Sequence, residues 1–109
     1  MTILRIWRGA TKRERGDEYI DYLNETGLRD YRETQGNLGA LLLRRDDGDL
    51  ARFTTLSLWS SLDEIRAFAG DDIEQARYYP EDEEFLVEHE DIVEHHEVVA
   101  GELEALALG

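Results

Sequence analysis

The segment from Leu56 to Tyr79 constrains the fold most, because it predicts a strand, a helix and an aromatic-rich turn in direct succession. Side chains alternate between the two faces of a strand. One face of the predicted strand carries Phe53, Thr55, Ser57 and Trp59, and the other carries Thr54, Leu56 and Leu58. We expect one of these faces to be core and the other to line a pocket.

The residues after this strand carry the start and stop signals of an amphipathic helix. Ser60 or Ser61 is a suitable N-cap, and carboxylates follow in the first turn, where they meet the positive end of the helix. The buried stripe is predicted to contain Ile65, Phe68 and Ala69, and Gly70 is a stop signal. A second short helix is expected through Ile73, Ala76 and Tyr79.

The rest of the chain supplies three more strands and one more helical zone. Strands are predicted over residues 2–10, 38–45, 51–60 and 92–100, and helical zones over 14–33 and 61–87. Gly27 is expected to bend or split the first zone, and Pro80 to open the last turn of the second. The sequence Asp46-Asp47-Gly48-Asp49 predicts a tight hairpin turn, because glycine adopts the positive backbone angle such turns need.

The order strand, helix, strand, strand, helix, strand is typical of the α+β class and of the ferredoxin-like split βαβ fold, with both helices on one face of an antiparallel sheet. The opposite face then keeps apolar side chains that one helical layer does not cover. We therefore expect a symmetric homodimer with two sheets packed face to face. One domain is predicted over residues 1–100, with a tail over 101–109.

Charge and composition exclude several classes of function. The 109 residues include 26 acidic and 12 basic ones, for a net charge of -14, which opposes binding to nucleic acid and to anionic membranes. The carboxylates are spread along the chain, as in proteins of salt-loving organisms. The absence of cysteine excludes disulfides and thiolate sites. With no leader and no apolar run of ~20 residues, a cytoplasmic protein is expected.

Several segments together resemble the antibiotic biosynthesis monooxygenase family of dimeric α+β barrels. The resemblance rests chiefly on SLWSSLDEIRAFAG, IEQARYYPEDEEFL and VEHHEVV, and extends to ILRIWRG, YIDYLNETGL and GNLGALLLRR. It covers nearly the whole chain. The resemblance implies a ferredoxin-like domain that dimerises into a barrel, with a pocket between each sheet and its helices.

In some members of this family, aromatic polyphenols react with oxygen in that pocket without flavin, haem or metal. The chemistry needs a deprotonated substrate, an apolar cavity and donors that stabilise an anion. The resemblance assigns catalytic roles to Trp59, Tyr78 and His96, and substrate binding to Arg77, Tyr79, Arg8 and Phe68. His95 and His96 point to opposite faces of their strand, and His96 is expected to be the more buried because it shares its face with Ile92 and Val98. No cofactor and no metal site are expected.

The sequence bears on two other functions. Haem degradation is rejected because the first strand lacks the asparagine of that branch and Arg77-Tyr78 stands where its histidine is expected. A non-enzymic dimer that binds a small ligand or serves a stress response remains the alternative. In that alternative, Trp59, Tyr78 and Phe68 fill the core and the interface, and the interior holds no void large enough for an aromatic ring.

Overall fold

The computed structural model describes residues 1–102. Its elements follow the order β1 (Ile3–Lys12), α1 (Gly16–Glu25), α2 (Gly27–Glu33), β2 (Asn37–Asp47), β3 (Leu50–Trp59), α3 (Leu62–Ala69), α4 (Asp82–Phe85), β4 (Leu86–His89) and β5 (Glu94–Glu97). A single 3-10 turn, Arg13–Arg15, joins β1 to α1. The predicted α+β class and ferredoxin-like order are confirmed. Part of the predicted 101–109 tail, residues 103–109, lies outside the described residues.

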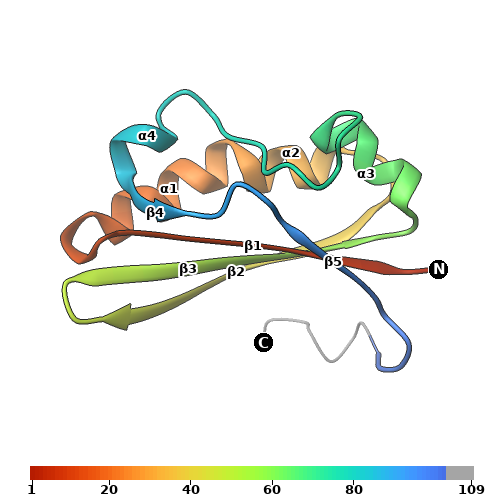
Figure 1. The fold of residues 1–109 in the computed structure, drawn as a ribbon, viewed down its shortest axis with the longest axis horizontal. Helices are drawn as coiled ribbons and strands as arrows, with labels where there is room; N and C mark the ends of the chain where they lie inside the picture. Colours follow the sequence, from red (N-terminus) through yellow and green to blue (C-terminus); the bar gives the residue numbers. More distant parts are fainter. Residues whose placement is uncertain (103–109) are drawn as a thin grey trace.

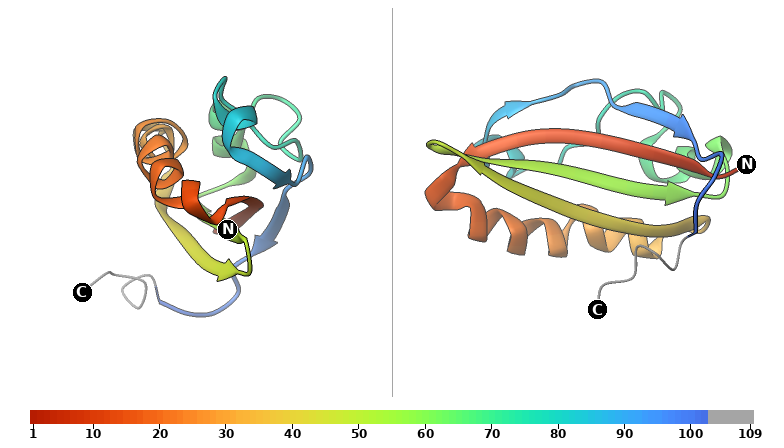
Figure 2. Two further views of the ribbon diagram at one scale, coloured as in Figure 1. Left: turned by 90° about the vertical axis from the view of Figure 1, so that its left-hand side faces the viewer. Right: turned by 90° about the horizontal axis from the view of Figure 1, so that it is seen from below.

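The sheet is antiparallel, with strand order β2-β3-β1-β4, and β5 pairs with β1 beyond the end of β4. Figure 1 shows all the helices on one side of this sheet. The two views of Figure 2 show that none of the helices in the described part of the chain covers the other side. The structure therefore has two layers, and its sheet has one covered and one open face.

Local signals explain where the helices begin and end. The Ser61 hydroxyl accepts a hydrogen bond from the Glu64 amide at 3.3 Å and caps α3, so Ser61 is the N-cap of the two serines considered. Gly70 ends α3 with a φ of 90°, a conformation that favours glycine. The first helical zone is split at Thr26, immediately before Gly27, so the predicted interruption is confirmed. Gly48, with a φ of 61°, forms the predicted hairpin turn between β2 and β3.

The predictions for the last third of the chain are partly wrong. Residues 70–81 form no helix, because their backbone groups bond to other segments: the Ala76 amide donates to the Asp91 carbonyl, and the Val93 amide to the Glu74 carbonyl, both at 2.8 Å. Residues 86–89 form β4 instead of extending a helix. The predicted strand over 92–100 is shorter, since β5 covers Glu94–Glu97 alone.

The core lies between the covered face and the helices, in two clusters. One cluster centres on Trp7, Tyr19 and Phe53, and the other on Trp59, Ile65 and Phe68. The β3 face that carries Phe53, Thr55, Ser57 and Trp59 is thus core, and the cavity described below opens on this same face. The opposite β3 face, with Leu56 and Leu58, lines a wide hollow on the open side of the sheet, as expected for the second face. The additional small cavity on the core face was not expected from the strand pattern.

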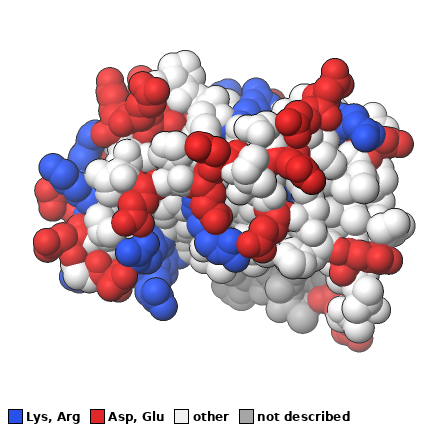
Figure 3. Space-filling model, in the orientation of Figure 1, with Lys and Arg blue, Asp and Glu red and all other residues white. Residues whose placement is uncertain are grey.

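The open face is apolar at its centre. Register places the side chains of Leu4 and Ile6 on this face beside those of Leu56 and Leu58, and β2 adds two more leucines at positions 41 and 43. Leu43 is 45% exposed. Acidic side chains are spread over the helical side and the edges of the molecule rather than gathered in one patch (Figure 3). No helix within residues 1–102 is both long and apolar enough to cross a bilayer.

Candidate functional site

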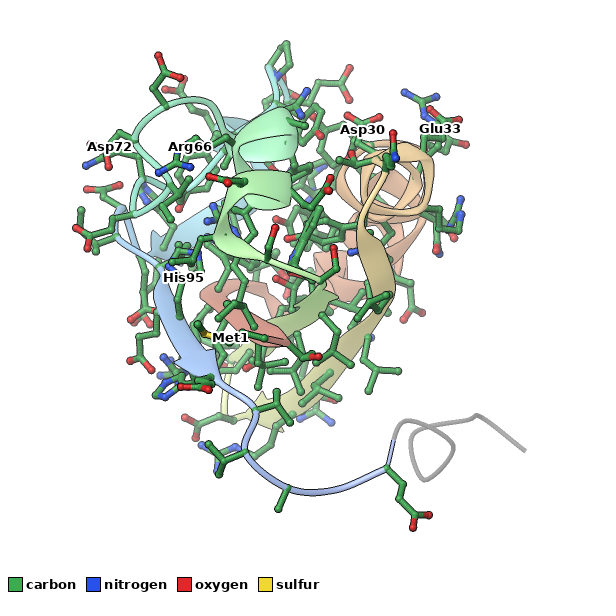
Figure 4. The ribbon with its side chains drawn as sticks, turned by 90° about the vertical axis from the view of Figure 1, so that its right-hand side faces the viewer. Met1, Asp30, Glu33, Arg66, Asp72 and His95 are labelled. Atoms are coloured by element: carbon green, nitrogen blue, oxygen red, sulfur yellow. The ribbon has the colours of Figure 1, made fainter. Side chains whose placement is uncertain are left out.

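A small cavity lies between the covered face of the sheet and the helical layer. Its volume is about 40 Å³. Its walls come from β1, β3, the α1–α2 pair, α3, the 70–81 segment and the start of α4; Arg5, Trp7, Tyr19, Phe68, Tyr78 and Asp82 are among the lining side chains. Viewed along the sheet in Figure 4, Asp30 on α2 and Asp72 beyond α3 lie on the two sides of the helical layer, and His95 lies on β5 below Asp72. The site has the position that the family resemblance implied.

Four of the predicted site residues line this cavity: Phe68, Arg77, Tyr78 and Tyr79. Neither tyrosine hydroxyl is free. The Tyr78 hydroxyl accepts a hydrogen bond from the Trp7 indole N–H at 3.0 Å and donates one to the Glu90 carbonyl. The Tyr79 hydroxyl donates to Asp30 Oδ2 at 2.5 Å. A ligand that bonds to either phenol therefore has to displace a partner within the protein.

The charge of Arg77 is also engaged. Its guanidinium lies 3.3 Å from Asp30 Oδ2 and donates to the Phe68 carbonyl at 2.9 Å. It also lies 4.9 Å from the ring centroids of Phe68 and Tyr79, a cation–π distance. Burial raises the pKa of the Tyr79 phenol, and its hydrogen bond to Asp30 adds to the shift. Arg77 therefore joins α2, α3 and the 70–81 segment through contacts within the protein.

Trp59, the first predicted catalytic residue, does not line the cavity. It is completely buried, and its indole N–H donates to the Ser57 hydroxyl at 2.9 Å. Its ring packs 6.0 Å from Tyr31 and 5.9 Å from Phe68, between centroids, and these two rings form the cavity wall. Trp59 can thus affect a ligand only through the rings in front of it.

The structure places two further predicted residues, His96 and Arg8, on the open face of the sheet. His96 is exposed and lies 3.1 Å from Glu94, while Arg8 forms ion pairs with Glu90 and Glu94 at 3.4 and 3.2 Å. The expectation that His96 is the more buried histidine is wrong. β5 pairs with β1 so that His95 lies opposite Arg5, on the covered side of the sheet. Residues 92 and 98 lie outside β5, so they do not share a strand face with His96.

Arg5 is the first site residue that the sequence analysis missed. It is 2% exposed and lines the cavity. Its guanidinium donates to the Ile73 carbonyl, to the Gln75 carbonyl at 3.0 Å, and contacts His95 Nε2, also at 3.0 Å. Burial lowers the pKa of Arg5, and burial together with the charge of Arg5 lowers the pKa of His95, so the imidazole is neutral and accepts this bond. Its position between Ile3 and Trp7, two apolar residues on the same face of the strand, was the available signal.

Asp82 is the second missed residue. It is 4% exposed and lines the cavity, where Oδ1 accepts from the Tyr19 hydroxyl at 3.2 Å and Oδ2 accepts from the Tyr79 amide at 2.6 Å. Within residues 1–102 it forms no ion pair with an arginine, a lysine or a histidine. Burial raises the pKa of Asp82 and of Tyr19, although the two hydrogen bonds offset part of the shift for Asp82. In the sequence, Asp82 belongs to the acidic run 81–84, a pattern that predicts a solvated surface.

The described residues contain no group of three His, Cys, Asp or Glu side chains placed to hold a metal ion. The cavity presents a buried carboxylate, a buried guanidinium and a wall of aromatic rings.

Comparisons with known proteins connect this fold to a named group. No family model and no curated protein sequence matches the chain. Among solved structures, a Nitrosomonas europaea protein of unknown function superposes with a TM-score of 0.69 at 16% identity, over 94% of this chain and 93% of that one. A Chloroflexus aurantiacus protein, provisionally named an antibiotic biosynthesis monooxygenase, gives 0.61 at 17% identity, over 94% and 97%.

A third solved structure adds a stated activity. It is SnoaB from Streptomyces nogalater, described as a cofactor-independent oxygenase and solved as a mutant; it superposes with a TM-score of 0.55 at 13% identity, over 94% of this chain and 96% of that one. At these identities the likeness establishes the fold. The chain therefore has the fold of proteins named antibiotic biosynthesis monooxygenases, which confirms at the level of structure the resemblance found in its sequence.

Proposed function

We propose that this protein is a cofactor-independent oxygenase acting on a small phenolic or quinol-like aromatic substrate. The observation that carries the proposal is Asp82, a carboxylate that is 4% exposed, lacks an ion-pair partner among the described residues, and faces a cavity walled by aromatic rings. A buried carboxylate with a raised pKa is a better proton acceptor for a weak acid than a solvated one. The fold it shares with a named cofactor-independent oxygenase adds support.

Asp82 would take the proton that makes the substrate reactive. The substrate gives a proton to the carboxylate, either from its phenol O–H or, in the keto tautomer, from the C–H bond across the ring. The electron pair of the broken bond remains on the substrate ring. The anion then supplies electrons to oxygen directly. For a methylene position the balance is CH₂ + O₂ → C=O + H₂O, in which the substrate provides all four electrons and no other reductant is consumed. Aromatic walls exclude water from the anion.

The cavity must widen before an aromatic ring can enter. Its volume of about 40 Å³ is well below the ~150 Å³ of a cavity that holds benzene. The wall formed by Tyr78 is the one most able to move, because this side chain is 36% exposed and belongs to the irregular 70–81 segment. Displacing Tyr78 would cost the hydrogen bonds to Trp7 and Glu90.

The same small volume favours a second candidate, a non-enzymic protein that binds a small ligand. In that case the aromatic side chains fill the core, as the structure has them, and the cavity holds two or three water molecules or a small polar ligand. The two candidates differ in whether a substrate is turned over.

Oxygen consumption separates them. Chelator-treated protein in molar salt is mixed with one-ring hydroquinones and then with fused-ring phenols, and autoxidation blanks are subtracted. Asp82→Asn should lower kcat by about 100-fold or more, the contribution typical of a general base. Glu83→Gln removes one charge from the neighbouring exposed position and should leave kcat unchanged. No uptake by a folded protein would reject the oxygenase in favour of the binding protein, and equal rates for both variants would remove Asp82 from the mechanism.

We also propose that the protein is a homodimer whose two open sheet faces pack together. The support is the apolar centre of that face, formed by Leu4, Ile6, Leu41, Leu56 and their neighbours. A sheet face of this kind is stable in water when a second layer covers it.

Light scattering after size exclusion tests this assembly. Leu41→Asp should halve the molar mass, whereas Leu62→Asp, at a 40% exposed position on the helical side, should not. A wild-type monomer at micromolar concentration would contradict the proposal.

A further inference from the structure

Arg5 carries a buried charge that no carboxylate of residues 1–102 neutralises. Its side chain is almost inaccessible, yet none of its three contacts is an anion: two are backbone carbonyls, of Ile73 and Gln75, and the third is neutral His95. Among residues 1–102 no Asp or Glu lies within ion-pair distance of Arg5. A buried ion without a counter-charge is costly, and an anion that enters beside it regains much of that cost.

The other arginines near the site are already paired. Arg77 lies 3.3 Å from Asp30, and Arg8 is on the opposite face of the sheet with Glu90 and Glu94. Arg5 is therefore the cavity-lining cation whose charge is available to a ligand. A guanidinium has five N–H donors in a planar fork, and the contacts above use three of them.

Aromatic surface lies next to this cation. The Arg5 guanidinium is 5.9 Å from the centroid of the Phe68 ring, and Tyr31, whose ring centroid is 4.5 Å from that of Phe68, lies close enough to raise the pKa of Arg5 against the effect of burial. All three side chains line the cavity. A ligand that fits this arrangement has a flat ring and an anionic oxygen at its edge.

We propose that the site selects aromatic anions, phenolates or aryl carboxylates, and that Arg5 binds their charged oxygen. This inference rests on the site of the proposed function and names the class of ligand it takes. The net charge of -14 repels anions at long range. A preference for an anion over a neutral molecule of the same shape must therefore come from a local contact.

Benzoate and benzamide test the inference, because they have nearly the same size and shape and differ in charge. Calorimetric titration at moderate ionic strength should show benzoate binding about 10-fold or more tightly than benzamide, as expected for hydrogen bonds to a charged group. Arg5→Met keeps the apolar stem and should reduce this ratio to about one. Arg8→Met, the same change on the other face of the same strand, should preserve the ratio.

Two results would overturn the inference: a ratio near one in the wild-type protein, or a ratio that survives Arg5→Met. If Arg5→Met does not fold, the Nε–H signal of Arg5 in nitrogen-15 NMR decides. A shift of that signal with benzoate and not with benzamide supports the inference, and no shift with benzoate overturns it.

The benzoate binding test and the oxygen consumption test can fail separately. Selective binding of benzoate by a protein that consumes no oxygen would keep Arg5 as the anion site and reject the oxygenase. Oxygen uptake without selectivity for benzoate would keep the oxygenase and reject the role of Arg5.

Discussion

Replacement of Trp59 by phenylalanine would show whether this residue stabilises the fold or serves the reaction. The indole is completely buried, donates to the Ser57 hydroxyl at 2.9 Å, and packs against Tyr31 and Phe68. Since the side chain lies behind the cavity wall and not in it, we expect Trp59→Phe mainly to lower the free energy of unfolding.

Three losses set the magnitude. The smaller ring buries roughly 35 Å² less apolar surface, worth about 0.9 kcal/mol at ~25 cal/mol per Å². It leaves a void of roughly 40 Å³, worth about 1 kcal/mol at ~24 cal/mol per Å³. The lost hydrogen bond leaves the buried Ser57 hydroxyl without its donor, at about 1 kcal/mol. The sum is about 3 kcal/mol, large for a domain of this size.

Urea unfolding followed by circular dichroism measures this change, and an unaltered slope shows that the denatured state is the same. Ser57→Ala removes the acceptor alone and should cost about 1 kcal/mol. In the double variant the hydrogen bond is lost once, so the two effects should fall short of additivity by about that amount. A stability change under ~0.5 kcal/mol together with lost turnover would refute this reasoning and give Trp59 a functional role.

Three further predictions concern other parts of the molecule. A Cβ at Gly9 would lie 2.6 Å from the Trp7 ring and 3.2 Å from the Glu88 carbonyl, so Gly9→Ala should destabilise by about 1–3 kcal/mol and shift the tryptophan fluorescence; unchanged stability and emission would contradict this. The raised pKa of Asp82 means that the native state holds a proton more tightly than the unfolded state. Stability therefore falls as the pH rises from 3.8, the ordinary pKa of an aspartate, toward the higher pKa of Asp82 in the native state. Tyr19, Tyr22, Tyr78 and His89 are the ionisable side chains that interact with Asp82. In urea titrations between pH 4 and 7 the stability of Asp82→Asn relative to wild type should rise with pH; a constant difference would show that burial does not raise the pKa of Asp82. Because a charge of -14 is spread over the molecule, added NaCl should raise Tm through screening, and a salt-independent Tm would exclude repulsion as a limit on stability.

The sequence predicts the structure around a residue well when the groups that the residue contacts lie a few positions away in the chain, and poorly when they lie far away. The α3 cap at Ser61 and the interruption at Gly27 were predictable, because each depends on residues a few positions away. The 70–81 segment was predicted wrongly as a helix because its carbonyls bond to Arg5, which is about 70 positions distant. The positions of His95 and His96 were exchanged for a related reason, since the pairing with β1 decides which of two alternating residues lies on the covered face.

The sequence by itself determined the order of elements from β1 to α3 and the antiparallel hairpin between β2 and β3, because periodicity and turn residues act over short distances. It also determined which segment carries aromatic side chains to the site. Only the tertiary structure decided that Arg5 and Asp82 are buried with no ion-pair partner among residues 1–102, and that Arg77 and both neighbouring tyrosines are already bonded. Burial and ion pairing depend on contacts between segments that are distant in the sequence. The same residue types on a solvated surface would have neither buried charges nor shifted pKa values.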